Sequence, residues 1–235
     1  MVGMKNSSLT GMAMALTAAI LWGTTGTAQS FVAATSSPYW IAALRLLIAS
    51  AAFAGVVACS RPLSAHGFSG LRAAWPTVLL GGCAMAAYNL CFFAGVKATG
   101  VATGTAVAIG SGPVWVGVLQ LLLGRGAPRP LWWLGTALAV FGIALMLSGA
   151  GRETGVDALG FLFCLAAGLA YASFTLISQH LLRISSPETS TLALFSTAAV
   201  FATAVAAFTA GPLIATTTTW LMVSYLGLVA TGFLL

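Results

Sequence analysis

Apolar residues occur in long runs separated by short polar stretches, and this pattern predicts a series of membrane-spanning helices. Eight runs approach or exceed the roughly 20 residues that cross a bilayer. They cover residues 9–34, 38–58, 75–96, 100–122, 131–149, 158–180, 188–211 and 218–235. Strand-like alternation is absent from these runs, which favours helices over a closed barrel. We therefore predict an all-α polytopic membrane protein with about eight helices.

The composition strengthens this prediction and excludes several other classes. Of the 235 residues, 60% are hydrophobic and 5% are charged, whereas a soluble domain carries about 25% charged residues. The net charge of +6 comes from single, scattered residues, so no nucleic-acid-binding patch is expected. The four cysteines and two histidines lack metal-ligand spacing, and we expect no disulfide, metal or cofactor. The lipid bilayer is the expected surrounding of most of the chain.

The first run has two interpretations. Residues 9–34 resemble a signal peptide with small residues at Ala33 and Ala34 as a cleavage site. Because many further spans follow, we favour an uncleaved first helix.

The distribution of positive charges predicts the orientation. With the N-terminus in the cytoplasm, the outer side receives only Lys97 and Arg152. The cytoplasmic side then receives Lys5, Arg61, Arg72, Arg125, Arg129 and Arg183. Because cytoplasmic loops carry the excess of Lys and Arg, this distribution predicts a cytoplasmic N-terminus.

An internal repeat relates the two halves of the chain. A shift of 149 residues places Ser36-Ser37-Pro38 on Ser185-Ser186-Pro187 and Trp22 on Tyr171. A shift of 146 places Leu80-Gly81 on Leu226-Gly227. Helices 1, 2 and 3 thus correspond to helices 6, 7 and 8. A repeat unit of five helices is odd, so the second copy is inverted in the membrane, as in many secondary transporters.

The repeat also predicts what a complete second copy requires. If the first unit covers residues 9–149, the second begins near residue 158 and needs roughly 60 residues beyond Leu235 to supply helices 9 and 10. We expect a fragment of a ten-helix carrier, or a chain completed by a partner. Little or no transport is expected from the 235-residue form alone.

Several motifs resemble one transporter family. They are AAILWGTTGTA (residues 18–28), ALRLLIA (43–49), GSGPVWVGVLQLLLGR (110–125) and WLGTALAVFGIALML (133–147). In order and spacing they are similar to the EamA-domain proteins of the drug/metabolite transporter superfamily. One departure is Gly124-Arg125, where the family commonly has Gly-Glu, and this puts in doubt any role of that acid.

The resemblance implies a fold, a location and a class of cargo. It implies two EamA units, at 9–149 and, incomplete, at 158–235. It also implies an exporter or permease of the plasma (inner) membrane, with both termini cytoplasmic. Its cargo would be small metabolites such as amino acids or drug-like compounds.

Polar and aromatic residues within the spans are the candidate substrate-binding residues. They are Trp22, Thr24, Thr25, Tyr88, Asn89, Ser111, Trp115 and Tyr171. A polar side chain at this depth needs a partner, found either in a cavity or across a helix interface. Pro113 within the fourth span, beside Gly110 and Gly112, predicts a kink. The kink either borders a cavity or only serves packing.

Arg45 is an intramembrane charge with two open interpretations. It lies about 10 Å below the outer end of the second span, so its side chain can extend toward the headgroups or pack against neighbouring helices. Alternatively it faces a water-filled cavity and binds an anionic group. The family resemblance favours a structural role. No Asp or Glu lies mid-span, so carboxylate-based coupling to a proton or sodium ion is not expected.

An enzyme and a channel or structural scaffold are the other classes of function that compete with a carrier. An intramembrane protease needs a serine close to a histidine or an HExxH motif, and neither occurs mid-span, so we expect no enzyme. A channel or a structural membrane scaffold remains the alternative. Channel flux would be independent of substrate, whereas a carrier saturates and shows counterflow.

Overall fold

The fold is all-helical. The computed structural model describes residues 16–17, 20–32, 36–59, 64–149 and 157–231, and this part of the chain contains no strand. Its helices are α2 (Thr25–Ser30), α3 (Pro38–Cys59), α4 (Ser64–Ala73), α5 (Trp75–Thr99), α6 (Val101–Leu122), α7 (Pro130–Gly149), α8 (Ala158–Leu181), α9 (Pro187–Thr209), α10 (Thr217–Ser224) and the π-helix η1 (Tyr225–Val229). The predicted fold class is confirmed.

Five helices are long and apolar enough to cross a membrane: α3, α5, α6, α8 and α9. Two further apolar segments, Pro130–Leu145 of α7 and Thr217–Val229, are shorter. The predicted ends of the spans agree with these helices to within a few residues. The largest extension is α5, which continues to Thr99 because the chain turns only at Gly100, where φ is +85°. The chain is therefore a multi-pass membrane protein.

Three predicted elements need correction. The first span is not one continuous helix, because a turn at Thr24 precedes α2 and its hydroxyl donates to the carbonyl of Leu21 at 2.6 Å. The last span is divided between α10 and η1. The polar stretch before Trp75, expected to be a loop, contains α4. Residues 9–15, 18–19, 33–34 and 232–235 of the outer predicted spans lie outside the described residues.

The ends of the helices have local sequence causes. Asp157 caps α8 by accepting the amide hydrogen of Leu159 at 3.1 Å. Ser186 caps α9 in the same way, followed by Pro187 in the first turn, where no amide hydrogen is needed. In the equivalent first-half position, Ser37 accepts from the amide of Tyr39 at the start of α3.

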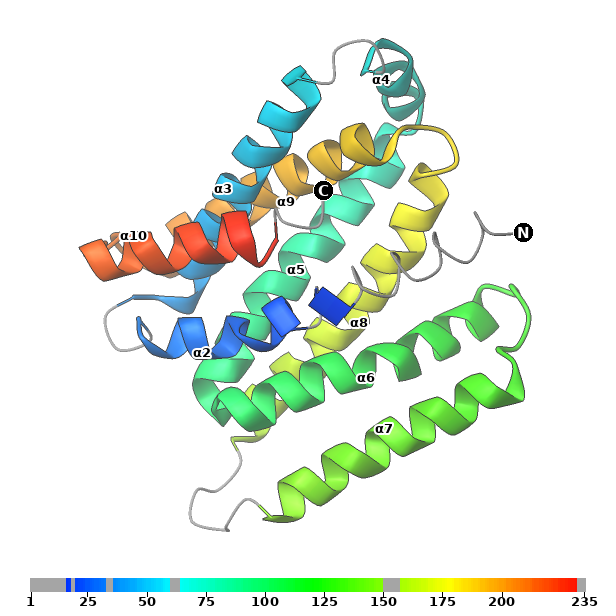
Figure 1. Cartoon of the computed structure of the whole chain (residues 1–235), viewed down its shortest axis with the longest axis vertical. Helices are drawn as coiled ribbons and strands as arrows, with labels where there is room; N and C mark the ends of the chain where they lie inside the picture. Colours follow the sequence, from blue (N-terminus) through cyan, green and yellow to red (C-terminus); the bar gives the residue numbers. More distant parts are fainter. Residues whose placement is uncertain (1–15, 18–19, 33–35, 60–63, 150–156, 232–235) are drawn as a thin grey trace, which may run out of the picture.

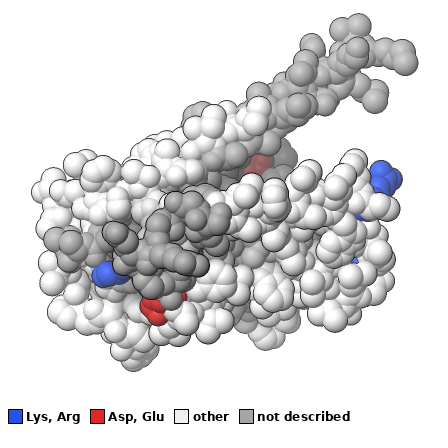
Figure 2. Space-filling view, turned by 90° about the horizontal axis from the view of Figure 1, so that it is seen from below, with Lys and Arg blue, Asp and Glu red and all other residues white. Residues whose placement is uncertain are grey.

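Successive helices alternate in direction and bring the loops to two ends of the bundle (Figure 1). At one end lie α4, the α6–α7 loop and the α8–α9 loop, with Arg72, Arg125 and Arg183. Helix α4 contacts the α8–α9 loop here, because a methyl group added to Gly70 would lie 2.6 Å from the carbonyl oxygen of Ile184. The opposite end contains Lys97, near the close of α5. In Figure 2 the surface between is almost wholly uncharged. Lys5, Arg61 and Arg152 lie outside the described residues.

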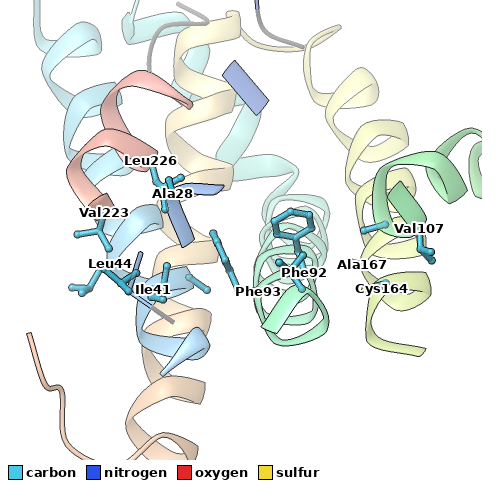
Figure 3. Packing of buried hydrophobic residues seen from close by; sticks show 14 residues of the cluster. Ala28, Ile41, Leu44, Phe92, Phe93, Val107, Cys164, Ala167, Val223 and Leu226 are labelled. Atoms are coloured by element: carbon cyan, nitrogen blue, oxygen red, sulfur yellow. The ribbon is translucent and has the colours of Figure 1, made fainter. Parts of the chain in front are cut away.

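Helices α5 and α8 form the centre, and small residues let them approach closely. A Cβ atom added to Gly95 of α5 would lie 3.1 Å from the Gly160 carbonyl oxygen of α8. Around this pair, one buried cluster joins α2, α3, α5, α6, α8 and the α10–η1 segment; Phe92 and Phe93 of α5 lie between the other elements (Figure 3). By contrast α7 packs mainly against α6 and exposes most of its leucines.

Contacts between the halves follow the sequence repeat. Gly81 of α5 packs against Leu194 of α9, and its counterpart Gly227 of η1 packs against the backbone of Arg45 in α3. The shift of 149 residues pairs Arg45 with Leu194, so equivalent glycines meet equivalent positions. The helix pairs α5–α9 and η1–α3 are thus alike, as expected for two halves related by an approximate two-fold axis.

Candidate functional site

A cavity of about 190 Å³ lies where the two halves meet. We call it the central cavity. Five lining side chains come from the first half and five from the second: Trp22, Arg45, Phe53, Met85, Tyr88, Tyr171, Phe174, Thr191, Phe195 and Thr231. Two pairs among them are equivalent in the repeat, Trp22 with Tyr171 and Met85 with Thr231. The cavity therefore brings together positions that the sequence repeat relates.

Aromatic rings form most of its wall. Tyr171 contacts Trp22 edge-on, with ring centroids 5.9 Å apart, and Tyr88 at 5.1 Å. From Tyr171 the rings continue through Phe174 to Phe195 and Phe53, with centroids 5.0 to 6.4 Å apart. Such pairs stabilise one another in edge-to-face or tilted arrangements. The wall is mainly aromatic, with hydroxyl groups from the tyrosines and threonines.

Arg45 is the charged group of this wall. Its side chain is 4% exposed, so it does not extend to the surface, and the snorkelling interpretation is wrong. Its Nε donates to Thr231 Oγ1 at 3.1 Å, and its guanidinium lies 5.7 Å from the centroid of Phe93. Its Nη1 is buried without a hydrogen-bond partner in the described part of the chain.

The irregular η1 segment joins helices of the first half to the cavity. The Ala230 amide hydrogen-bonds the Tyr225 carbonyl five residues earlier, and the Ala230 carbonyl accepts from Trp22 Nε1 at 3.1 Å. Thr231 Oγ1 donates to the Leu226 carbonyl and accepts from Arg45. Single-turn π-helices occur frequently at functional sites because they redirect backbone groups.

Two predicted residues of the first half, Thr24 and Thr25, do not line the central cavity. Thr24 Oγ1 donates to the Leu21 carbonyl, so the Tyr225 hydroxyl, 2.6 Å away, is the donor in their contact. Thr24 thus belongs to the contact between the first span and η1. Thr25 is buried.

Asn89 is fully buried in α5. Its amide donates to the Met85 carbonyl of the same helix at 2.9 Å, while Oδ1 has no partner among the described residues. It does not line the central cavity.

Ser111 and Trp115 lie elsewhere. They line a second cavity of about 330 Å³ between α6, α7 and α8, which we call the peripheral cavity. The other side chains there are aliphatic, apart from Phe161. Ser111 Oγ donates to the Ala108 carbonyl of its own helix. The structure therefore separates these two residues from Trp22, Tyr88 and Tyr171.

The predicted kink residues lie in α6, where Gly110 also lines the peripheral cavity. Helix α6 continues through Pro113 to Leu122, and the kink remains a prediction. A Cβ atom on Gly110 would overlap Ile143 of α7, and one on Gly112 would lie 3.9 Å from Tyr171. The two glycines thus face different neighbours.

A third, larger opening lies at the end of the bundle that contains Arg125. This groove of about 720 Å³ runs between α5, α6 and α8, and its lining is mainly aliphatic, with Arg125 and His180 at its polar end.

Sequence reasoning missed six of the ten lining residues of the central cavity: Phe53, Met85, Phe174, Thr191, Phe195 and Thr231. Phenylalanine, methionine and threonine are ordinary in apolar spans, so their types alone give no signal. The repeat could have indicated Thr231, because the shift of 146 residues pairs it with Met85, one helical turn before Tyr88 and Asn89.

Known proteins with similar sequences or folds define the family. The EamA-like transporter family matches residues 9–148. The chain is 37% identical over 188 residues to "Uncharacterized transporter YwfM" of Bacillus subtilis (strain 168), covering 80% of this chain and 62% of that protein. It thus spans less than two thirds of that relative's length.

A solved crystal structure has the same fold. The TM-score is 0.70 at 21% sequence identity, over 94% of this chain and 75% of that one. The match to the family model and to the Bacillus subtilis relative shows the family: the chain belongs to the EamA-like transporter family.

Proposed function

We propose that this protein is a secondary carrier that moves a small metabolite, such as an amino acid, a related compound or a drug, through the central cavity by alternating access. The observation that supports this most directly is the composition of that cavity, with five side chains from each half. A site at the meeting point of two related halves can open to either side when one half rocks against the other.

The contacts between the halves suit such a motion. At Gly81 and Gly227 helices of the two halves approach closely, since an added Cβ atom would lie 2.5 Å from Leu194 and 2.7 Å from Ile48. Without side chains, these positions would not interlock as one half moves against the other. The Trp22–Tyr171 contact joins equivalent residues across the approximate axis, so it can separate or close symmetrically.

For orientation we propose a cytoplasmic N-terminus in the plasma (inner) membrane. The end of the bundle with Arg72, Arg125, Arg129 and Arg183 would then face the cytoplasm and the end with Lys97 the outside. We further propose that the two units correspond to residues 9–149 and 158–235. Helices 9 and 10, from a longer chain or a partner, would complete the second unit.

The test is solute counterflow in proteoliposomes. The protein is expressed from its complete reading frame, reconstituted, and assayed with a panel of radiolabelled amino acids and the dye ethidium. A carrier gives saturable uptake that is accelerated by unlabelled solute on the opposite side. Flux that rises linearly with concentration and lacks counterflow for every probe would contradict the proposal and favour a channel.

A further inference from the structure

We propose that Arg45 binds a carboxylate of the transported solute, which makes the cargo a small organic acid with an apolar or aromatic body. This proposal rests on the proposed function and names the substrate class of the same cavity. It begins from a charge that is buried without a counter-charge among the described residues.

Burying an unpaired guanidinium is costly, by several kcal/mol in proteins. Two contacts hold Arg45 in place: Nε donates to Thr231, and the guanidinium lies against the ring of Phe93. Neither supplies a negative charge. The contact with Phe93 recovers only part of the lost hydration.

No described carboxylate compensates Arg45. Asp157 caps α8 at the end of the bundle that also contains Lys97, and Glu188 lies in the first turn of α9. Neither lines the central cavity. An anion that enters the cavity therefore meets an uncompensated positive charge, whereas a cation is repelled.

The orientation of the guanidinium favours a carboxylate in particular. Arg45 Nε donates to Thr231 Oγ1, and Thr231 donates its own hydrogen to the Leu226 carbonyl. The bond to Nε fixes the plane of the guanidinium from one edge. The buried Nη1 stays without a partner among the described residues. Arginine presents a planar fork that pairs with carboxylates through parallel hydrogen bonds.

The remaining wall fits the rest of such a solute. Trp22, Tyr88 and Tyr171 offer further ring surface, continuous with the phenylalanines through the contact between Tyr171 and Phe174. At about 30 Å³ per water, 190 Å³ corresponds to about six water molecules. A small acid with one ring or a short chain suits this volume better than a large drug.

The test compares acids with their neutral amides. Binding of acetate, phenylacetate and indole-3-acetate, and of the three corresponding amides, is measured by isothermal titration calorimetry on the detergent-purified protein from the complete reading frame. We expect at least one acid to bind at least about tenfold more tightly than its amide, the ratio that a charge-assisted hydrogen bond supplies. Absence of this preference in all three pairs would overturn the proposal.

Variants then test whether Arg45 causes the preference for acids over amides. Arg45→Met should reduce the acid-to-amide ratio to about one, and Arg45→Lys, which keeps the charge but lacks the fork, should leave a smaller ratio. Arg183→Gln removes the same charge from the exposed α8–α9 loop and should change nothing. A preference that survives Arg45→Met would overturn the proposal.

Thermal unfolding separates binding from a structural role. Because Arg45→Met removes a buried charge without a carboxylate partner, its melting temperature should equal or exceed that of the wild type. A lower melting temperature with the acid preference retained would assign Arg45 to structure instead. Should Arg45→Met fail to fold, Thr231→Val serves in its place, because loss of the Nε acceptor should lower the acid-to-amide ratio; an unchanged ratio would count against the proposal.

Two other outcomes distinguish this proposal from the proposed function and from lipid binding. Saturable counterflow of neutral solutes with no acid preference would refute the carboxylate assignment and leave the carrier standing. Acid binding through Arg45 without counterflow would refute the carrier function and leave the carboxylate assignment standing. If phosphatidylglycerol stabilises the protein through Arg45 while none of the acids binds, the anion is a lipid phosphate and the proposal is wrong.

Discussion

The central and peripheral cavities are built from similar residues, yet they differ in what surrounds them. Both contain a mid-span tryptophan and a hydroxyl group. The central cavity takes five lining residues from each half and includes Arg45, whereas the peripheral cavity is lined mainly by α6 and α7 of the first half, with Phe161 and Leu165 of α8, and by no charged residue. The type of a side chain thus does not assign it to a site. The helices that meet at its position do, because they decide which other side chains, such as Arg45, line the same cavity.

The largest expected difference between the two regions concerns helix packing. A Cβ atom at Gly227 would lie 2.7 Å from Ile48 and 3.0 Å from the Arg45 carbonyl, whereas Gly142 on α7 has open space. Gly227→Ala should destabilise the protein by about 1–3 kcal/mol through overpacking, and Gly142→Ala should not. Thermal unfolding in detergent measures both. Equal melting temperatures for the two variants would contradict the expected difference in packing between Gly227 and Gly142.

The next difference concerns the aromatic residues. Tyr171→Ala removes a ring that contacts Trp22, Tyr88 and Phe174 in the central cavity, and transport affinity should fall by about tenfold. Trp115→Ala, in the peripheral cavity, should change it by less than about twofold at equal expression. The transport affinity of both variants is measured from counterflow kinetics. A larger loss for Trp115→Ala would place the substrate in the peripheral cavity.

The smallest effect is expected for Ser111. Its hydroxyl bonds to a carbonyl of its own helix and borders the apolar peripheral cavity. Ser111→Ala should alter stability by no more than about 0.5 kcal/mol and leave transport unchanged. Melting temperature and counterflow provide the two readouts, and a clear loss of transport at normal stability would reconnect Ser111 with the pathway.

The site was only partly predictable. Trp22, Arg45, Tyr88 and Tyr171 were identified because polar or aromatic groups stand out in apolar spans, and all four line one cavity. Asn89, equally conspicuous, bonds within its own helix instead. A neighbouring position on a helix points about 100° away, so adjacent residues such as Tyr88 and Asn89 face different surroundings, and sequence alone does not say which surroundings contain the cavity.

The sequence by itself determined the five long apolar helices, their approximate ends and the repeat. Apolar runs of this length must satisfy their backbone hydrogen bonds internally, and residues such as Ser186, Pro187 and Gly100 begin or end helices through local chemistry. Only the tertiary structure decided that the last span contains η1, that Arg45 is buried against Thr231, and that Ser111 and Trp115 lie apart from Trp22. These features depend on contacts between residues far apart in the chain, such as Arg45 and Thr231, and no local pattern encodes the distance between two helix faces.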